Sequence, residues 1–236
     1  MPRRHQPGHS VPVSVSQNFL TRKQTIRRLI RIAGLEKNDH VVEIGAGRGH
    51  ITQELAKTCG NVCAYEIDHK LAERLYAEFN NSNVRVHRQD FLTATLPKGA
   101  PYKVFANIPF NRTSEIVRKL ASPHSALDEA WLVMEKGAAK RFAGQPRESL
   151  ASLLLKPFFD MEIRYYFQRE DFHPAPSVDV VLLRLKHKAE PDVPASQRRA
   201  YETFVGKHIG RLPRVSGEML YVQWLCLFRR SRGERA

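Results

Sequence analysis

The chain has 236 residues, enough for one domain of ordinary size with a small addition. Hydrophobic residues at 42% and charged residues at 26% are typical of a folded globular protein and exclude a disordered or collagen-like chain. No apolar run approaches the roughly 18 residues of a membrane-spanning helix. The first forty residues contain several arginines and lack the apolar core of a secretory signal, so we expect a cytoplasmic protein with no membrane partner.

Positive charge is concentrated at the two ends of the chain. The formal net charge is +14, from 38 basic and 24 acidic residues. Residues 1–35 hold seven basic and no acidic side chains, and residues 197–236 hold nine basic and three acidic ones. A nearly neutral body with two basic ends is typical of a catalytic or binding core whose extensions bind a polyanion. A generally basic protein with frayed ends is the alternative.

Strand-like and helix-like segments alternate along most of the chain. The hydrophobic pattern predicts strands at 41–44, 61–66, 84–88, 102–106, 131–134, 161–167 and 178–185, and helices at 51–57, 68–79 and 113–120. This order predicts an α/β domain with a mostly parallel sheet, whose last strand is a sheet edge or part of a hairpin. A proline-containing segment at 188–194 predicts a linker. The roughly forty residues beyond it are helical in pattern and too few for a core of their own.

Three glycines, Gly45, Gly47 and Gly49, follow the first predicted strand where a helix begins. Glycine lets a ligand approach the backbone, and the helix N-terminus has free N–H groups. The G-x-G-x-G spacing differs from the pyrophosphate motif, and no Gly-Lys-Ser/Thr follows, which argues against a dinucleotide and an NTP. Glu66 ends the next strand, 21 residues after Gly45, where a carboxylate can accept hydrogen bonds from ribose hydroxyls. A plain tight turn is the alternative to a nucleoside site.

Two further motifs follow the third and fourth strands. Asp90 and Phe91 would offer a carboxylate to an adenine amino group and an apolar face to its ring. In the segment from Asn107 to Phe110, the Asn107 side-chain carbonyl and a backbone carbonyl, held apart by Pro109, are two acceptors for one NH2 group.

Phe110 can stack on the ring that carries this amine, a set that suits methyl transfer to an exocyclic amine such as adenine N6. Positioning carries most of the catalysis in such a transfer, without a metal or an activated nucleophile. The three cysteines lack the spacing of zinc ligands. A proline turn whose phenylalanine is part of the core is the alternative.

Taken together, these motifs resemble those of the rRNA adenine N6-methyltransferases. The matching segments are QNFL at 17–20, EIGAGRG at 43–49, EID at 66–68, QDF at 89–91, NIPF at 107–110 and FHPAPSVD at 172–179. From about residue 15 to 227 the chain resembles the Erm branch, the macrolide-lincosamide-streptogramin B resistance methylases. The sister branch, which dimethylates adjacent adenines of small-subunit rRNA, is the alternative, and a catalytically silent nucleic-acid-binding relative is another.

The resemblance implies a Rossmann-like class I methyltransferase sheet with a small C-terminal helical domain. It implies S-adenosyl-L-methionine as methyl donor and one adenine of 23S rRNA, protein-free or partly assembled, as acceptor of one or two methyl groups. The domains implied are a basic extension at 1–14, a catalytic domain at 15–188 and a short RNA-binding domain at 189–236, in a monomer.

The resemblance also assigns residues to the two ligands. The cofactor is expected to contact Gln17, Asn18, Leu20, Gly45, Gly47, Glu66, Ile67, Asp90, Phe91 and Asn107. The target base is expected between Asn107, Ile108, Phe110 and Phe172, with the two phenylalanines replacing the stacking that an adenine loses when it turns out of folded RNA.

Overall fold

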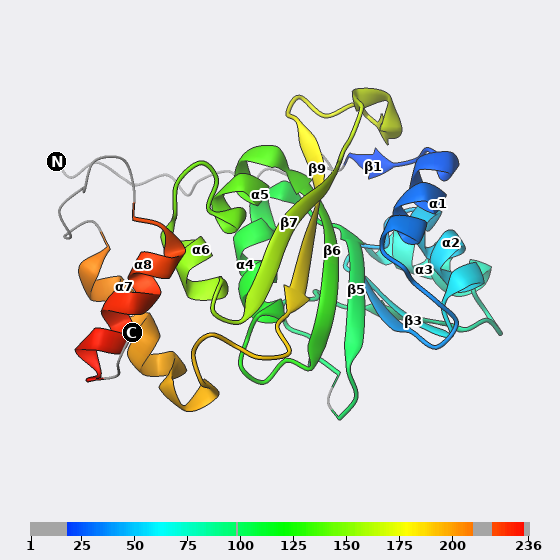
Figure 1. Ribbon diagram of the computed structural model, residues 1–236. Helices are drawn as coiled ribbons and strands as arrows, with labels where there is room; N and C mark the ends of the chain where they lie inside the picture. Colours follow the sequence, from blue (N-terminus) through cyan, green and yellow to red (C-terminus); the bar gives the residue numbers. More distant parts are fainter. Residues whose placement is uncertain (1–17, 98, 210–218, 234–236) are drawn as a thin grey trace, which may run out of the picture.

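A seven-stranded sheet forms the centre of the computed structural model, which describes residues 18–97, 99–209 and 219–233 (Figure 1). The strand order is β4-β3-β2-β5-β6-β9-β7. The first five strands in this order run parallel, and β9 runs antiparallel to both β6 and β7. The strands are β2 (His40–Ile44), β3 (Asn61–Glu66), β4 (Val84–Arg88), β5 (Tyr102–Asn107), β6 (Leu127–Glu135), β7 (Phe159–Tyr166) and β9 (Val180–His187).

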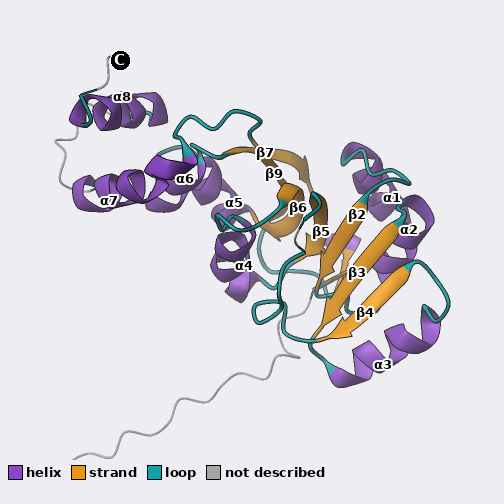
Figure 2. Ribbon diagram, turned by 90° about the horizontal axis from the view of Figure 1, so that it is seen from below, coloured by secondary structure: helices purple, strands orange, loops and turns teal. Residues whose placement is uncertain are grey.

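Helices cover both faces of the sheet (Figure 2). Alternate strand residues point to opposite faces, so Val41 packs with α1, α2 and α3 while Val42 packs with α4, α5 and α6. The result is an α/β sandwich with a separate hydrophobic cluster on each side of the sheet, and the predicted α/β class is confirmed. The helices are α1 (Lys23–Ile32), α2 (His50–Thr58), α3 (His69–Glu78), α4 (Thr113–Leu120), α5 (Lys136–Ala143), α6 (Leu150–Leu155), α7 (Arg198–His208) and α8 (Tyr221–Ser231).

The strand predicted at 178–185 is not at a sheet edge. β9 pairs with β6 on one side and with β7 on the other, forming a hairpin-like pair with β7. The run Val180–Leu183 is buried throughout because both of its faces are covered. A continuous apolar run of this kind is typical of an interior strand.

A second, two-stranded sheet joins the start of the described chain to the segment after β7. β1 (Phe19–Leu20) pairs antiparallel with β8 (Phe172–His173), with Leu20 opposite Phe172. The short helix η3 (Arg169–Asp171) precedes β8, and the backbone carbonyl of Asp171 accepts a 3.0 Å hydrogen bond from Thr21 N–H. These contacts fix the start of α1 against the β7–β9 connection.

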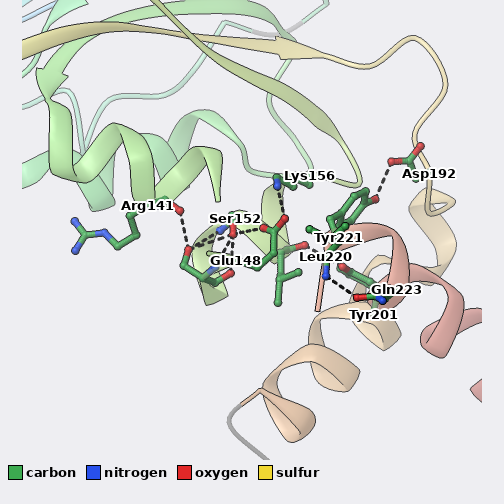
Figure 3. A network of polar contacts seen from close by, with 11 residues as sticks. Arg141, Glu148, Ser152, Lys156, Asp192, Tyr201, Leu220, Tyr221 and Gln223 are labelled. Carbon is green, nitrogen blue, oxygen red and sulfur yellow. Dashed lines mark hydrogen bonds and ion pairs between the residues drawn. The ribbon is translucent and has the colours of Figure 1, made fainter. Parts of the chain in front are cut away.

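Helices α7 and α8 lie beside α6, where polar contacts join them to the rest of the chain (Figure 3). The Tyr201 hydroxyl donates to the Leu153 carbonyl at 3.0 Å, and the Tyr221 hydroxyl donates to Asp192 at 2.7 Å. Asp192 also accepts a 2.6 Å hydrogen bond from Lys188. The segment predicted as a linker is therefore held in place by defined contacts, and the helical region after it contributes to the hydrophobic cluster of α4–α6.

No helix in the described ranges has both the length and the apolar character that spanning a membrane requires.

Candidate active site

A cavity of about 300 Å³ opens at the carboxyl ends of β2, β3, β4 and β5. Ligands of open α/β sheets bind at this edge, where the strand order reverses. Ten of the predicted site residues line the cavity. They are Asn18, Gly45, Gly47, Glu66, Ile67, Asp90, Phe91, Asn107, Ile108 and Phe110.

The glycine loop between β2 and α2 forms one wall of the cavity. Gly47 has a φ of +58°, and a Cβ atom at this position would lie 2.8 Å from the ring of Phe19. A larger residue would therefore combine backbone strain with a steric clash. The guanidinium of Arg48 lies over the same ring, 4.9 Å from its centre, in a cation–π contact that helps to hold Phe19 in place.

The carboxylate of Glu66 connects the glycine loop to the start of α3. Its Oε2 accepts a 2.7 Å hydrogen bond from Gly47 N–H, and its Oε1 accepts one of 2.8 Å from Asp68 N–H. The Glu66 residue is only 2% exposed. Each carboxylate oxygen can accept a second hydrogen bond, so Glu66 can hold the loop and still bind a pair of hydroxyl groups.

A tight turn at 90–94 forms another part of the cavity wall. Asp90 Oδ1 accepts a 2.8 Å hydrogen bond from Leu92 N–H, and the ring of Phe91 packs edge-on against Tyr65 at 5.5 Å. Lys119, on α4, donates to the carbonyls of Phe91 (2.7 Å) and Leu92 (2.9 Å) and also to that of Ala94. Burial lowers the pKa of Lys119, which the nearby charge of Asp90 opposes. The ammonium group of Lys119 thus holds three backbone carbonyls of the turn together.

Asn107 ends β5 with its side chain in a fixed orientation. Its Nδ2 donates a 2.7 Å hydrogen bond to the backbone carbonyl of Asn18, which leaves Oδ1 as the acceptor on the other side of the amide. No described residue donates to this oxygen or to the Ile108 carbonyl. Pro109, at φ −64°, then turns the chain so that Phe110 also lines the cavity. The predicted pair of acceptors and the predicted aromatic ring thus face the same space.

Two predicted residues are placed differently. Leu20 and Phe172 do not line the cavity, and they pack in the core opposite each other across β1 and β8. Phe172 is 4% exposed, with its ring 5.1 Å from that of Phe167. Its role against a target base stays a prediction, and it requires the ring to leave this packing. Gln17 lies outside the described residues, as does the predicted extension at 1–14.

Glu43, the first residue of the glycine motif, is buried beneath the loop. It is 1% exposed, and its Oε2 has no hydrogen-bond partner among the described residues. Burial, together with the charge of Glu66, raises the pKa of Glu43 to about 8. The carboxyl is therefore mostly neutral at pH 7.

Several cavity residues were not predicted from the sequence. Phe19 and Tyr65 line the cavity beside predicted neighbours, and Arg112 lies 3.8 Å from Asp90. Phe19 is part of the QNFL segment, so its position next to Asn18 was the available signal. Lys119 carries no such signal, because its contact with the turn depends on how α4 packs. In the described part of the chain, no cluster of three His, Cys, Asp or Glu side chains could hold a metal.

Comparison with known proteins gives consistent matches over most of the chain. A family model described as ribosomal RNA adenine dimethylase matches residues 8–223. An rRNA adenine N-6-methyltransferase of Lysinibacillus sphaericus is 40% identical over 204 residues, which cover 86% of this chain and 82% of that protein.

A ribosomal RNA small subunit methyltransferase A of Metamycoplasma arthritidis is 34% identical over 172 residues, which cover 72% of this chain and 66% of that protein. Among solved structures, the 23S rRNA methyltransferase ErmE superposes with a TM-score of 0.77 and 30% identity. This match covers 90% of the present chain and 99% of ErmE.

Proposed function

The chain belongs to the ribosomal RNA adenine dimethylase family of methyltransferases, and we propose that it methylates N6 of a single adenine in the peptidyl-transferase region of 23S rRNA. S-adenosyl-L-methionine is the proposed donor, with one or two methyl groups transferred. Methylation there would confer macrolide-lincosamide-streptogramin B resistance. The observation that carries the proposal is the convergence of the Asn107 and Ile108 acceptors with Phe110, Glu66 and Asp90 in one cavity. The similarity to ErmE supports the large-subunit target.

The described residues fit S-adenosyl-L-methionine. A cavity of about 300 Å³ is large enough for a small ligand. Glu66 has acceptor capacity left for two ribose hydroxyls, and Asp90 with Phe91 offers an acceptor and an apolar face to adenine. Gly47 leaves space that a Cβ atom would fill. When bound, this cofactor supplies a methyl group on a sulfonium centre.

The chain itself would act by holding the target amine. Asn107 Oδ1 and the Ile108 carbonyl would accept the two N–H bonds of adenine N6, which favours a pyramidal nitrogen with its lone pair free to attack. The hydrogen bond from Asn107 Nδ2 to Asn18 fixes this acceptor before the base arrives, so little reorganisation is needed. Phe110 would stack on the base. The N6 proton can pass to water after the amine becomes cationic, so no side chain is needed as a general base.

The RNA must present the adenine unstacked, because Asn107 and Phe110 can hold only a base that has left its helix. We expect protein-free or partly assembled 23S rRNA to be the substrate and a monomer in the cytoplasm to be the active form. The excess of basic residues would bind phosphates, so affinity should fall steeply with salt.

A second candidate is dimethylation of small-subunit rRNA. It is favoured by the similarity to the small-subunit methyltransferase of Metamycoplasma arthritidis. The two candidates share the same cavity chemistry and differ only in the RNA that reaches it.

The test is methyl transfer from labelled S-adenosyl-L-methionine to protein-free large- and small-subunit rRNA, supplied separately, with modified bases mapped by reverse-transcriptase stops. We expect a single stop in the peptidyl-transferase region. A pair of stops near the end of small-subunit rRNA would establish the second candidate instead. RNA binding without transfer to either would indicate a catalytically silent relative.

The role of Asn107 has its own test. Asn107→Ala should abolish methyl transfer while RNA affinity stays at the parent value, because the substitution removes the amine acceptor and its hydrogen bond to the Asn18 carbonyl but no side chain that binds phosphate. Asn80→Ala makes the same change at an exposed position outside the cavity and should transfer normally. Full activity of Asn107→Ala would refute the role given to this residue.

A further inference from the structure

A second cleft, of about 590 Å³, lies between α1 and the end of β7, and arginine side chains line it. Helix α1 contributes Arg27, Arg28 and Arg31, and the N-cap residue just before it is Arg22. Strand β7 contributes Tyr165. All four arginines are exposed. No part of the proposed catalytic cavity includes these residues.

The carboxylates near this cleft neutralise only part of its charge. Asp171 is 1% exposed, and its carboxylate accepts hydrogen bonds from the Thr25 hydroxyl (2.6 Å) and Gln168 N–H (3.0 Å). Arg22 lies 3.7 Å from it. Among the described residues, no carboxylate pairs with Arg28.

The second carboxylate, Glu54, is shared between two cations. It pairs with Arg27 at 2.8 Å and also with Lys57 at 2.8 Å. Arg31, one turn beyond Arg27, has no ion pair within the described ranges. The cleft therefore keeps an excess of positive charge.

This arrangement is unfavourable for α1 by itself. Arg27 and Arg31 are four residues apart, a spacing at which like charges repel. Arg22 and Lys23 stand at the positive end of the helix dipole, and the first turn contains no acidic residue. Such charges are stabilised when a polyanion lies against them.

The guanidinium of Arg28 is held in place for binding. It lies 5.2 Å from the centre of the Tyr165 ring, and the ring packs edge-on against Phe167. A stacked guanidinium loses less side-chain entropy when its N–H groups bind phosphate oxygens.

The cleft is also close to the catalytic cavity along the chain. Phe19 lines the cavity and Arg22 lines the cleft, and β1 joins the two directly (Figure 1). Three residues of extended chain span at most about 11 Å. A strand of RNA with one base in the cavity would therefore place neighbouring phosphates within reach of α1.

We propose that this arginine cleft binds the RNA backbone next to the target adenine, so that the RNA contact surface extends over α1. This helix packs in the hydrophobic cluster on one side of the sheet, whereas α7 and α8 join the cluster on the other side. The proposal rests on the proposed RNA substrate. It assigns to α1 a phosphate-binding role that positions the strand without reading its sequence.

The first test measures RNA affinity against salt concentration, without methyl donor, for a labelled 23S rRNA fragment that spans the peptidyl-transferase region. The double variant Arg28→Gln/Arg31→Gln should lower the slope of log affinity against log salt by about 1.4, since each single-strand phosphate contact contributes about 0.7. Its affinity at low salt should fall by about tenfold. A control, Arg74→Gln/Arg85→Gln on α3 and β4, removes the same charge from exposed positions outside both cavities.

The control should keep the parent slope. If the cleft variant also keeps the parent slope, or if both variants lose affinity equally, the proposal is wrong. Calorimetry with S-adenosyl-L-methionine should give the parent affinity for the cleft variant, which separates a local effect from misfolding.

A second test locates the RNA. Gln24 lines the cleft and is exposed, so Gln24→Cys can carry a photo-crosslinker. Crosslinks should map within a few nucleotides of the methylated adenine, and the parent chain with its own cysteines gives the background. Crosslinks at distant positions, or none above background, would overturn the proposal.

These binding tests distinguish two kinds of failure. The cleft variant could show a lower salt slope, with crosslinks at neighbouring nucleotides, while the parent transfers no methyl group to 23S rRNA. That result would reject the proposed function and keep the RNA-binding surface. Normal transfer with unchanged slope would reject the surface alone.

Discussion

Lys119 offers a sharp test of how the cavity would bind the proposed cofactor. Its ammonium group donates hydrogen bonds to three backbone carbonyls of the turn at 90–94, two of them at 2.7 and 2.9 Å. Lys119→Met keeps most of the side-chain length and removes all three bonds. We expect the turn to lose its fixed shape. Binding of S-adenosyl-L-methionine would then have to order the turn, which makes the binding free energy less favourable.

The magnitude follows from the bonds that are lost. A hydrogen bond to a charged group contributes about 1.5–3 kcal/mol. Water can replace some of the three hydrogen bonds at this half-buried position, so we take the loss of binding free energy to be that of one hydrogen bond. The dissociation constant for S-adenosyl-L-methionine should then rise by roughly 10- to 150-fold, since 1.4 kcal/mol is tenfold.

Calorimetric titration with S-adenosyl-L-methionine is the assay. Lys103→Met is the matched control, because Lys103 is also a half-buried lysine with an ion pair, 2.8 Å from Asp39, and does not line the cavity. This control should bind the cofactor normally even where its stability falls. In steady-state kinetics, Lys119→Met should raise KM for the cofactor and leave KM for RNA unchanged. Cofactor affinity equal to that of the parent would refute the reasoning.

Two further predictions concern carboxyl groups. Glu66→Ala removes the acceptor for the Gly47 and Asp68 N–H groups as well as the proposed acceptor for the ribose hydroxyls. Calorimetry should therefore show the binding free energy of S-adenosyl-L-methionine weakening by about 2 kcal/mol or more, while RNA affinity hardly changes. An equal loss of both affinities would contradict this prediction. Burial raises the pKa of Glu43 from 4.5 to about 8, so between these pH values the folded chain holds a proton that the unfolded chain releases. The free energy of unfolding should therefore fall as pH rises from 4.5 to 8, by about 1.4 kcal/mol per pH unit. Glu43→Gln should remove this loss in urea unfolding at pH 6 and pH 8, and parallel pH profiles of variant and parent would speak against it.

Local patterns predicted the parallel part of the sheet well. The strands predicted at 61–66 and 84–88 coincide with β3 and β4, and Asp68 is the N-cap of α3, with its side chain accepting from Leu71 N–H. These segments have clear apolar runs and turn residues, so their structure depends little on distant contacts. The predicted rRNA adenine methyltransferase family is likewise confirmed.

Elements that depend on tertiary packing were missed. The apolar residues of α1, Ile26, Leu29 and Ile30, lie among arginines, and the segment was interpreted only as a source of charge. β1 and β8 have two residues each and exist only because they pair with each other. Neither pattern is visible in a short window of sequence.

The candidate site was largely predictable because its residues follow consecutive parallel strands. The carboxyl ends of such strands meet at one edge of the sheet, so Gly45, Glu66, Asp90 and Asn107 had to converge. The orientation of a side chain is a different matter. Phe172 points into the core because its strand pairs with β1, which the motif around it does not reveal.

The contacts of α7 and α8 bear on how this protein can be divided for experiments. Tyr201 and Phe228 are fully enclosed, with their rings 5.1 Å apart, in the same cluster as Leu153 of α6. Cutting the chain before α7 would expose that apolar surface of α6 to water and leave the Leu153 carbonyl without its donor. A shortened protein would therefore be prone to aggregate, and its loss of RNA binding would say little about which helices touch RNA. Point substitutions on exposed positions of α7 and α8 are the informative alternative.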